Sequence, residues 1–368
     1  MSKEPQYLTT DQPGVVFENT AVGRLKKEIW EASDEEIDAI LAEYGVPSPC
    51  EWAKPGSYIQ TTVRHELVEN RRKNDIVFIP VGSTELHGDH MVSATDTLFV
   101  SLICEAVRRY TAKRGAPVNL ALPPLMYGAH PYHHIGMPGT VIIRDEVVKE
   151  FMVDVMLGLW NDGFRKQIIV NNHGQLWVLV EAIHEFTKRY QLPGIYRVVD
   201  WHRAVREFFF VKEYGGEFDT PFVHAAEAET SLALLLFPEM VRMEYAVDTE
   251  PVSFLPGGHL DTSVDAYRRP CRWSEGEGHA AIEIAGTPEG VVGKPTRAAA
   301  HKAKRPLAAI LRYLTLLHDE ILEAFPPGKV PPTEMVSLRS AEEMEPYLKE
   351  PMSPGWKPVY GLPKIGQL

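Results

Sequence analysis

The sequence predicts an α/β fold of three layers, with helices on both faces of a mostly parallel central sheet. Short apolar runs alternate with amphipathic helical segments between residues 75 and 323. The apolar runs are bounded by turn-forming residues, as expected of strands that are buried on both faces. Acids and histidines also recur directly after these runs. Such an alternation is typical of consecutive βα units.

The first expected strand is the apolar run from Ile76 to Val81, which Gly82 ends. A helix follows, which Asp96 can cap and which ends at Gly115, with apolar residues at spacings of three and four. Further strands are expected at 118–122, 167–170 and 195–199, and further helices at 145–161, 176–190 and 297–324.

The βα series leaves an extension at each end of the chain. We expect residues 1–74 to form an N-terminal extension with a short helix at 34–44, and residues 75–325 to form the main domain. The stretch 251–278 is rich in proline, glycine and charge, and is expected to be an excursion from that domain. The tail, 326–368, has nine prolines in 43 residues. We expect it to lack regular structure and to wrap a surface of its own chain or of a neighbouring subunit.

Composition excludes several classes of partner. Thirty-eight basic against fifty acidic residues give a net charge of −12, which disfavours binding to nucleic acid or to an anionic membrane. The apolar runs fall far short of the roughly 20 residues that span a bilayer, and the N-terminus lacks the apolar core of a signal peptide. We therefore expect a cytoplasmic protein. Cys50, Cys104 and Cys271 are odd in number and widely separated, and are expected to be free thiols.

Metal-ligand chemistry follows the first expected strand. Glu85 and His87 come directly after it, and Asp96 returns from the start of the next helix. Two carboxylates and an imidazole within about a dozen residues suit Zn²⁺ or Mn²⁺. The alternative is a polar loop in which Glu85 caps a helix and the histidines are solvated.

A second histidine, His173, is expected at the same edge of the sheet, because the carboxyl ends of parallel strands meet at one edge. His173 closes an apolar strand, where a buried imidazole needs a partner or a metal. The alternative is a hydrogen-bonded histidine at a helix start. A third stretch carries His224, Glu227 and Glu229. The two glutamates cannot share one face of a helix, so only one should reach the site. Glu227 can instead occupy the polar first turn, where the helix dipole favours acids.

Four sequence motifs follow one another along the chain, and three of them contain these residues. They are PVGSTELHGDH at 80–90 with Asp96 beyond it, HIGMPGT at 134–140, NHG at 172–174 and HAAEAETS at 224–231. Together with Tyr127-Gly128, they resemble the motifs of the creatininase, or creatinine amidohydrolase, family over about residues 75–315. The resemblance implies a creatininase-like fold and a homo-oligomer, since the family forms hexamers.

The resemblance also implies a site for divalent cations, one or two per subunit, of zinc, manganese or iron. Asp96 would bridge the two cations, with Glu85 and His173 on one and His87 on the other. His224 matches the histidine that moves protons in the family. We take His224 and Glu229 as the catalytic candidates, and Glu229 also as a possible ligand.

The chain departs from creatininase at two positions. Gln175 stands where the family has a glutamate on the second metal, and Val223 stands where a glutamate precedes the proton-moving histidine. An amide is a weaker, uncharged ligand. The second metal is therefore held more loosely, is absent, or is completed by Glu229 or Glu227. Glu229 is favoured because it lies in the Glu-Thr-Ser that the family retains.

Several phrases, including the long N-terminal segment, resemble the inositol-catabolic branch of the family, which opens the cyclic diketone 3-dehydro-scyllo-inosose. We expect a metal-dependent hydrolase that attacks a carbonyl of a small polar ring and cleaves a C–C bond. Hydrolysis of a cyclic amide needs the same groups and is an alternative. A metal-stapled sugar-binding protein without turnover is another. A small polyhydroxylated substrate needs hydrogen-bonding walls, for which the candidates are His130, His133, His134, Gln175, Asp200, Trp201, His202 and Arg203.

Overall fold

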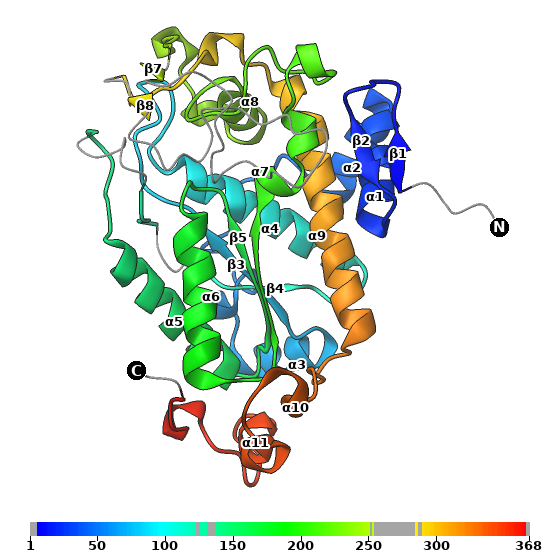
Figure 1. Cartoon of the computed structure of the whole chain (residues 1–368), viewed down its shortest axis with the longest axis vertical. Coiled ribbons are helices and arrows are strands. Elements are labelled where there is room, and N and C mark those ends of the chain that lie inside the picture. Colours follow the sequence, from blue (N-terminus) through cyan, green and yellow to red (C-terminus); the bar gives the residue numbers. More distant parts are fainter. Residues whose placement is uncertain are drawn as a thin grey trace, which may run out of the picture.

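A parallel sheet of four strands, in the order β4-β3-β5-β6, forms the centre of the computed structural model (Figure 1). The structure describes residues 6–122, 126–130, 137–250, 252–253, 284–285 and 289–365. The strands are β3 (Ile76–Val81), β4 (Asn119–Leu120), β5 (Lys166–Asn171) and β6 (Ile195–Asp200). All three strand pairs are parallel, as the sequence predicts.

The register of the sheet brings the carboxyl ends of three strands level. Val81 at the end of β3 pairs with Asn171 of β5, and Asn171 pairs with Asp200 of β6. Every residue of β3 and β5 is buried, which explains why β3 reads as a continuous apolar run rather than as an alternating pattern. The residues that follow these strands therefore begin at one common edge.

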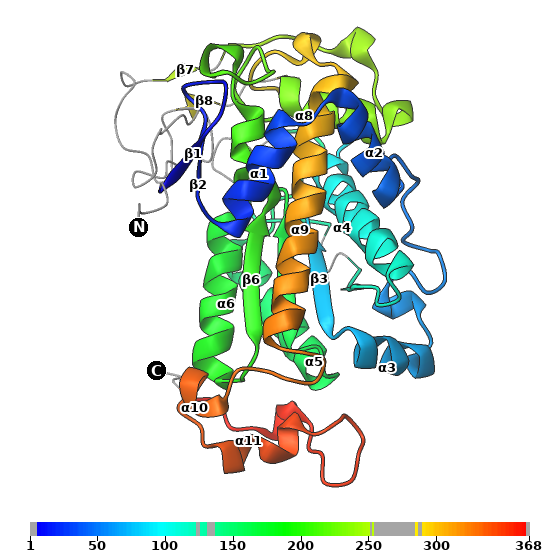
Figure 2. The ribbon, with the colours of Figure 1, turned by 90° about the vertical axis from the view of Figure 1, so that its right-hand side faces the viewer.

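Helices cover both faces of the sheet, so the predicted three-layer αβα architecture is confirmed (Figure 2). Ile76 and Phe78 of β3 pack into one core with α4 (Thr95–Lys113) and α9 (Lys304–Ala324). The alternate residues Val77 and Ile79 pack into a second core, which contains α5 and α6. These two helices are α5 (Asp145–Asn161) and α6 (Leu176–Tyr190), with the bounds that the periodicity predicts.

The first two helices of the N-terminal extension pack against α9. It contains the antiparallel strands β1 (Tyr7–Thr9) and β2 (Val16–Glu18), and the helices α1 (Ala21–Glu31), α2 (Asp34–Tyr44) and α3 (Arg64–Lys73). α1 and α2 both contact α9. A capping box between Ser33 and Glu36 starts α2, which Gly45 ends in the left-handed conformation, with φ of 67°.

Short elements lie beyond the carboxyl edge of the sheet. They are α7 (Trp201–Ala204), α8 (Glu227–Leu236), the pair β7 (Val252–Ser253) and β8 (Ile284–Ala285), and several 3-10 turns. The predicted helix at 297–324 begins later, because 295–297 and 300–303 form 3-10 turns before α9. Most of the predicted excursion at 251–278 falls outside the described residues.

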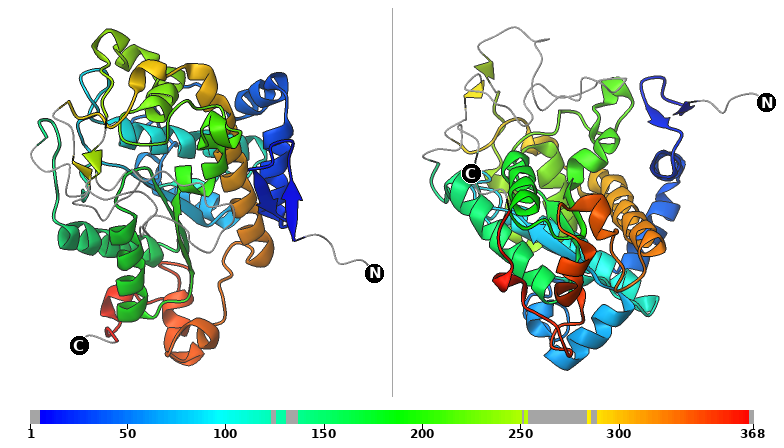
Figure 3. Two further views of the ribbon diagram at one scale, coloured as in Figure 1. Left: turned by 45° about the horizontal axis from the view of Figure 1, so that its top comes forward. Right: turned by 60° about the horizontal axis from the view of Figure 1, so that its bottom comes forward.

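The tail covers the amino-terminal end of the sheet, at the opposite end from α8 (Figure 3). The expectation that it lacks regular structure is wrong, because it forms α10 (Thr333–Val336) and α11 (Ala341–Leu348). The guanidinium of Arg165 donates to the carbonyls of Tyr347, Leu348 and Lys349, at 3.0, 2.8 and 3.2 Å. These bonds satisfy carbonyls that the end of a short helix leaves without partners.

Two further sequence predictions can be compared with the described residues. Cys50 and Cys104 are free thiols, and Cys271 lies outside the described part of the chain. Among the described helices, none combines the length and the apolar character needed to cross a bilayer.

Candidate metal centre

Four segments bring the predicted acids and histidines to the carboxyl edge of the sheet. Glu85 and His87 lie in the loop after β3, Asp96 in the first turn of α4, and His173 directly after β5. The fourth segment contributes His224 and the first turn of α8. Glycine at position 82 allows this convergence, since a Cβ there would lie 2.4 Å from the backbone nitrogen of Thr97. The loop can therefore pack directly onto the start of α4.

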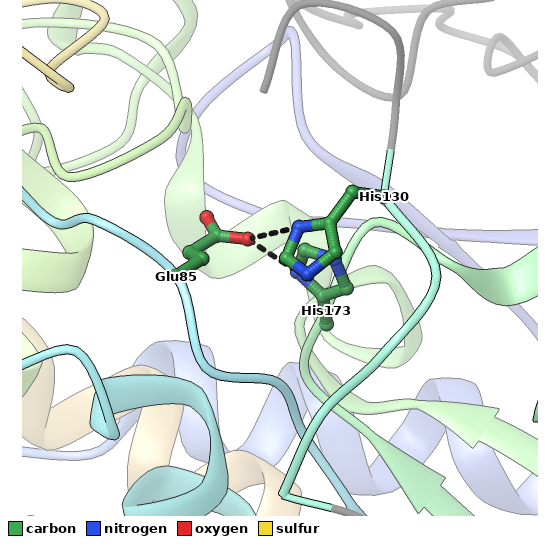
Figure 4. A group of neighbouring side chains, drawn as sticks. All are labelled: Glu85, His130 and His173. Atoms are coloured by element: carbon green, nitrogen blue, oxygen red, sulfur yellow. Dashed lines mark ion pairs between the residues drawn. The ribbon is translucent and has the colours of Figure 1, made fainter. Parts of the chain in front are cut away.

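Glu85, Asp96 and His173 form the first contact group. His173 Nδ1 lies 2.8 Å from Glu85 Oε2 and 3.2 Å from Asp96 Oδ2. His130 Nδ1 approaches the same Glu85 oxygen at 3.3 Å, and Figure 4 shows Glu85, His130 and His173 together. The side chains of all four residues are buried.

His87, Asp96 and Glu229 form the second contact group. His87 Nε2 lies 3.5 Å from Asp96 Oδ1 and 3.6 Å from Glu229 Oε2. The imidazole of His87 is fully buried, and Nε2 makes no hydrogen bond within the described residues. Asp96 thus faces both groups, one through each carboxylate oxygen. The donor atoms of each metal-ligand triplet lie within 4.8 Å of one another, and the triplets are Glu85–His130–His173, Glu85–His87–His224 and His87–Asp96–Glu229.

Three histidines use their remaining ring nitrogen in the same way. His173 Nε2 lies 2.9 Å from the carbonyl oxygen of Ala129, His87 Nδ1 lies 3.1 Å from that of Glu85, and His224 Nε2 lies 2.6 Å from that of Leu86. A carbonyl only accepts, so each neutral ring carries its proton on that nitrogen. The lone pair of the other nitrogen then faces carboxylates, a repulsive arrangement that a cation between them resolves. Metal-binding histidines are oriented in this way.

The electrostatics of the cluster also favour a positive charge. Burial would lower the pKa of His87, but the carboxylates of Asp96, Glu85 and Glu229 raise it to about 10. Burial opposes protonation of His173 too, yet the same carboxylates Glu85 and Asp96 raise its pKa to about 10. Within the described residues, Asp96 and Glu229 form ion pairs only with histidines. These side chains therefore fit a divalent cation by donor type, burial and charge.

Hydrogen bonds fix the orientation of Asp96, and their donors, Ser83 and Asn172, were not among the predicted site residues. Asn172 Nδ2 donates to Asp96 Oδ1 at 2.7 Å, and Ser83 Oγ donates to Asp96 Oδ2 at 2.8 Å. The indole of Trp201 donates to Asn172 Oδ1, so this fully buried ring orients the amide that holds Asp96. Ser83 lies in the motif at 80–90 and Asn172 in the motif at 172–174, so their place in the sequence marks both residues as belonging to the site.

The two glutamates of the third stretch separate, as their spacing predicts. Glu229 reaches His87, and Oε2 also accepts the backbone N–H of Ala225 at 2.6 Å. Ala225 is in the left-handed region, with φ of 53°, directly after His224. Glu227 points away from the cluster, and is bound by Lys302 Nζ at 2.5 Å and by the backbone N–H of Thr220 at 2.8 Å.

The predicted substrate-binding residues take different places. The amide of Gln175 is fully buried and bonds to backbone groups: Oε1 accepts from Ala129 N, and Nε2 donates to Gly82 O, both at 3.1 Å. It therefore braces the loops of the site through these hydrogen bonds. Asp200 contacts His202 at 2.8 Å and Arg203 at 3.5 Å. His133 and His134 lie outside the described residues.

Comparison with known proteins shows which family the chain belongs to. The sequence model of the creatininase family, described as creatinine amidohydrolase, matches residues 61–317. The chain belongs to the creatininase family, as its motifs predict. It is a hydrolase, which confirms the enzymatic reading over the non-catalytic one.

The chain is similar to individual members of this family to different extents. The chain is 47% identical over 305 residues to a 3-dehydro-scyllo-inosose hydrolase of Thermotoga maritima, covering 83% of this chain and 96% of that protein. It is 28% identical to a creatinine amidohydrolase of Pseudomonas putida, covering 49% of this chain and 72% of that protein. A solved mutant creatininase of Zn-Zn type shares the fold, with a TM-score of 0.56 and 21% identity over 74% of this chain and 99% of that one.

Proposed function

We propose that the chain hydrolyses a C–C bond of a cyclic diketone, with 3-dehydro-scyllo-inosose as the substrate. The observation that supports this substrate most strongly is the 47% identity to a hydrolase of that name, along nearly the whole length of that hydrolase. The cluster of buried carboxylates and imidazoles supports the same class of reaction. The relative named for creatinine is more distant, and Gln175 and Val223 depart from creatininase, so a cyclic amide is the weaker candidate.

We propose two divalent cations, zinc or manganese, at the two contact groups. Glu85, Asp96 and His173 would hold one, and His87, Asp96 and Glu229 would hold the other. Glu229 thus supplies the carboxylate that the family places at position 175. Cations bound there would supply Lewis acidity and would lower the pKa of a bound water. Three carboxylates against two dications leave a net positive charge, which favours an oxyanion.

The chain's own residues position and move the proton. Hydrolysis adds the water oxygen to a ring carbonyl carbon, breaks the adjacent C–C bond, and leaves a carboxylate and an enolate carbon that takes up a proton. His224 Nε2 lies against the carbonyl of Leu86, so Nδ1 is the ring atom that would accept and return that proton. Glu85 Oε1 lies 2.5 Å from Nδ1 and stabilises the protonated ring. Burial would lower the pKa of His224, but Glu85 raises it.

Asp96 must present one oxygen to each contact group throughout the reaction. Ser83 and Asn172 hold it in that orientation, and Trp201 holds Asn172. Such outer partners fix ligand geometry, and their loss typically reduces metal affinity about 10–100-fold.

The test is turnover by purified chain that has been stripped with EDTA and reloaded with Mn²⁺ or Zn²⁺. We expect 3-dehydro-scyllo-inosose to gain one water by mass spectrometry, only in the reloaded samples. Creatinine and a panel of lactams, assayed in parallel, should be left intact. Turnover of a lactam in preference to the diketone would replace the proposed substrate. Undiminished turnover after chelation would refute the metal chemistry.

We also propose a homo-oligomer. The tail exposes large apolar side chains, among them Met335, Leu338, Met352 and Tyr360, of which Leu338 is 84% exposed. A second copy of the chain that covered these residues would remove them from water. Light scattering at micromolar concentration should give a mass that is a whole-number multiple of 41.4 kDa greater than one. A monomer would contradict the proposal.

A further inference from the structure

His130 stands in a loop that the site itself holds in place. The segment 128–130 follows β4, and both backbone polar atoms of Ala129 are bound there: N–H to Gln175 Oε1 and the carbonyl to His173 Nε2. A Cβ at Gly128 would lie 2.7 Å from Gln175 Oε1, so the loop and this amide are in close contact. The position of His130 is therefore coupled to the metal-binding groups.

The side chain of His130 is buried against the first contact group. His130 Nδ1 and His173 Nδ1 approach one atom, Glu85 Oε2, at 3.3 and 2.8 Å. Their rings lie 4.4 Å apart at an angle of 60° (Figure 4). Donors placed tetrahedrally at the usual zinc bond lengths of 2.0–2.2 Å are roughly 3.3–3.6 Å apart. The 3.3 Å separation from His130 lies in this range, the 2.8 Å separation from His173 is shorter, and Glu85, His130 and His173 form one of the metal-ligand triplets.

We propose that His130 is a protein ligand of the cation held by Glu85, Asp96 and His173. This proposal rests on the proposed function and deepens it. The two metal positions then differ: the first has four protein donors, whereas the position of His87, Asp96 and Glu229 has three. A four-donor set is typical of closed zinc sites, and a three-donor set leaves an open position for water or substrate. The first cation is held tightly, and the second is the exchangeable one.

The substitution at position 175 makes this assignment chemically sensible. The amide of Gln175 is bound to backbone groups and offers no charge to a cation. That same amide fixes Ala129 N, the neighbour of His130, and so holds the imidazole in the site. Gln175 is thus no metal ligand itself, but it helps to position His130, which we propose as one.

Chelator competition on the full chain tests the proposal. Wild-type protein loaded with Co²⁺ or Zn²⁺ should hold two cations per chain by mass spectrometry and release them in two phases. His130→Ala should weaken the tightly held cation at least tenfold and leave the other phase unchanged. His87→Ala should remove the weak phase alone. The visible spectrum of the Co²⁺ protein should lose the intensity of a four-coordinate site in His130→Ala. His184→Ala, which removes an exposed histidine of α6, is the matched control.

His130→Asn separates a ligand from a hydrogen-bond donor to Glu85. An asparagine can donate to that carboxylate but is a poor ligand, so we expect it to behave like His130→Ala. If His130→Asn or His130→Ala keeps the wild-type release curve and Co²⁺ spectrum, His130 is not a ligand. If wild-type protein binds no cation at all, the proposed function itself fails, and the two failures are therefore distinct. Thermal melts without metal show whether each variant is folded.

Discussion

Replacing Asp96 with asparagine should abolish metal binding and leave the fold intact. The carboxylate is buried and accepts from Asn172 Nδ2 and Ser83 Oγ. An amide of the same shape still accepts from Asn172, and the Ser83 hydroxyl can rotate to accept from the new N–H. No cavity forms, so we expect a cost of about 1–3 kcal/mol in the free energy of unfolding of the metal-free protein. The variant loses the charge that faces both contact groups.

The size of the metal effect can be worked out. A cation at 100 times its dissociation constant stabilises the native state by about 2.7 kcal/mol, so the two proposed cations stabilise it by about 5.4 kcal/mol. For 368 residues the unfolding entropy is roughly 0.8 kcal/mol/K, so the wild-type Tm should rise by about 7 °C with Mn²⁺. Asp96→Asn should shift by less than about 1 °C. Losing roughly 4 kcal/mol of electrostatic stabilisation should reduce kcat/KM about 10³-fold.

The assay is differential scanning fluorimetry of EDTA-stripped protein, with and without Mn²⁺, together with the hydrolysis assay. Asp89→Asn is the control, because Asp89 is exposed in the same loop and should keep both the Tm shift and the activity. An Asp96→Asn enzyme that keeps the Mn²⁺-dependent shift, or whose activity stays within tenfold of wild type, would refute the reasoning.

Two further predictions separate site from scaffold. Glu229→Gln should lower the metal content and the activity and leave the thermal melt of the metal-free protein little changed. Glu227→Gln should lose roughly 2–4 kcal/mol of stability, because Lys302 loses its buried partner, but should bind metal normally. The opposite pattern would exchange the roles of the two glutamates. Arg165→Ala should lower the urea midpoint by the equivalent of about 2–4 kcal/mol and leave the activity of folded enzyme unchanged, because its three carbonyl partners lie in the tail, far from the site. An exposed control, Arg72→Ala, should do neither, and a loss of activity in folded Arg165→Ala would contradict the separation.

The periodicity of apolar residues was sufficient to predict the helices and strands of the central layers, because burial alone determines these elements. The predicted bounds of α5 and α6 match the structure, and the apolar run at 76–81 is β3. Periodicity failed where tertiary contacts override local preference. Residues before α9 form 3-10 turns, in which Ser231 Oγ accepts from Ala299 N and Lys302 reaches Glu227. A proline count likewise misjudged α11, whose C-terminal carbonyls Arg165 satisfies.

The sequence identified the polar residues of the site more readily than their partners. Glu85, His87, Asp96 and His173 follow strands whose ends must meet, and the structure brings them together as expected. The path from Trp201 through Asn172 to Asp96 joins three separate segments, and no local pattern encodes such a meeting. For the same reason Gln175 read as a wall of the substrate pocket, although its amide braces the backbone of the loop after β4.

Anomalous scattering from a crystal of the full chain loaded with Mn²⁺ tests the central claim most directly. We predict one peak among Glu85, Asp96 and His173 and a second between His87 and Glu229, both lost in Asp96→Asn crystals. A map without a peak among these side chains, from protein that still hydrolyses its substrate, would contradict the account.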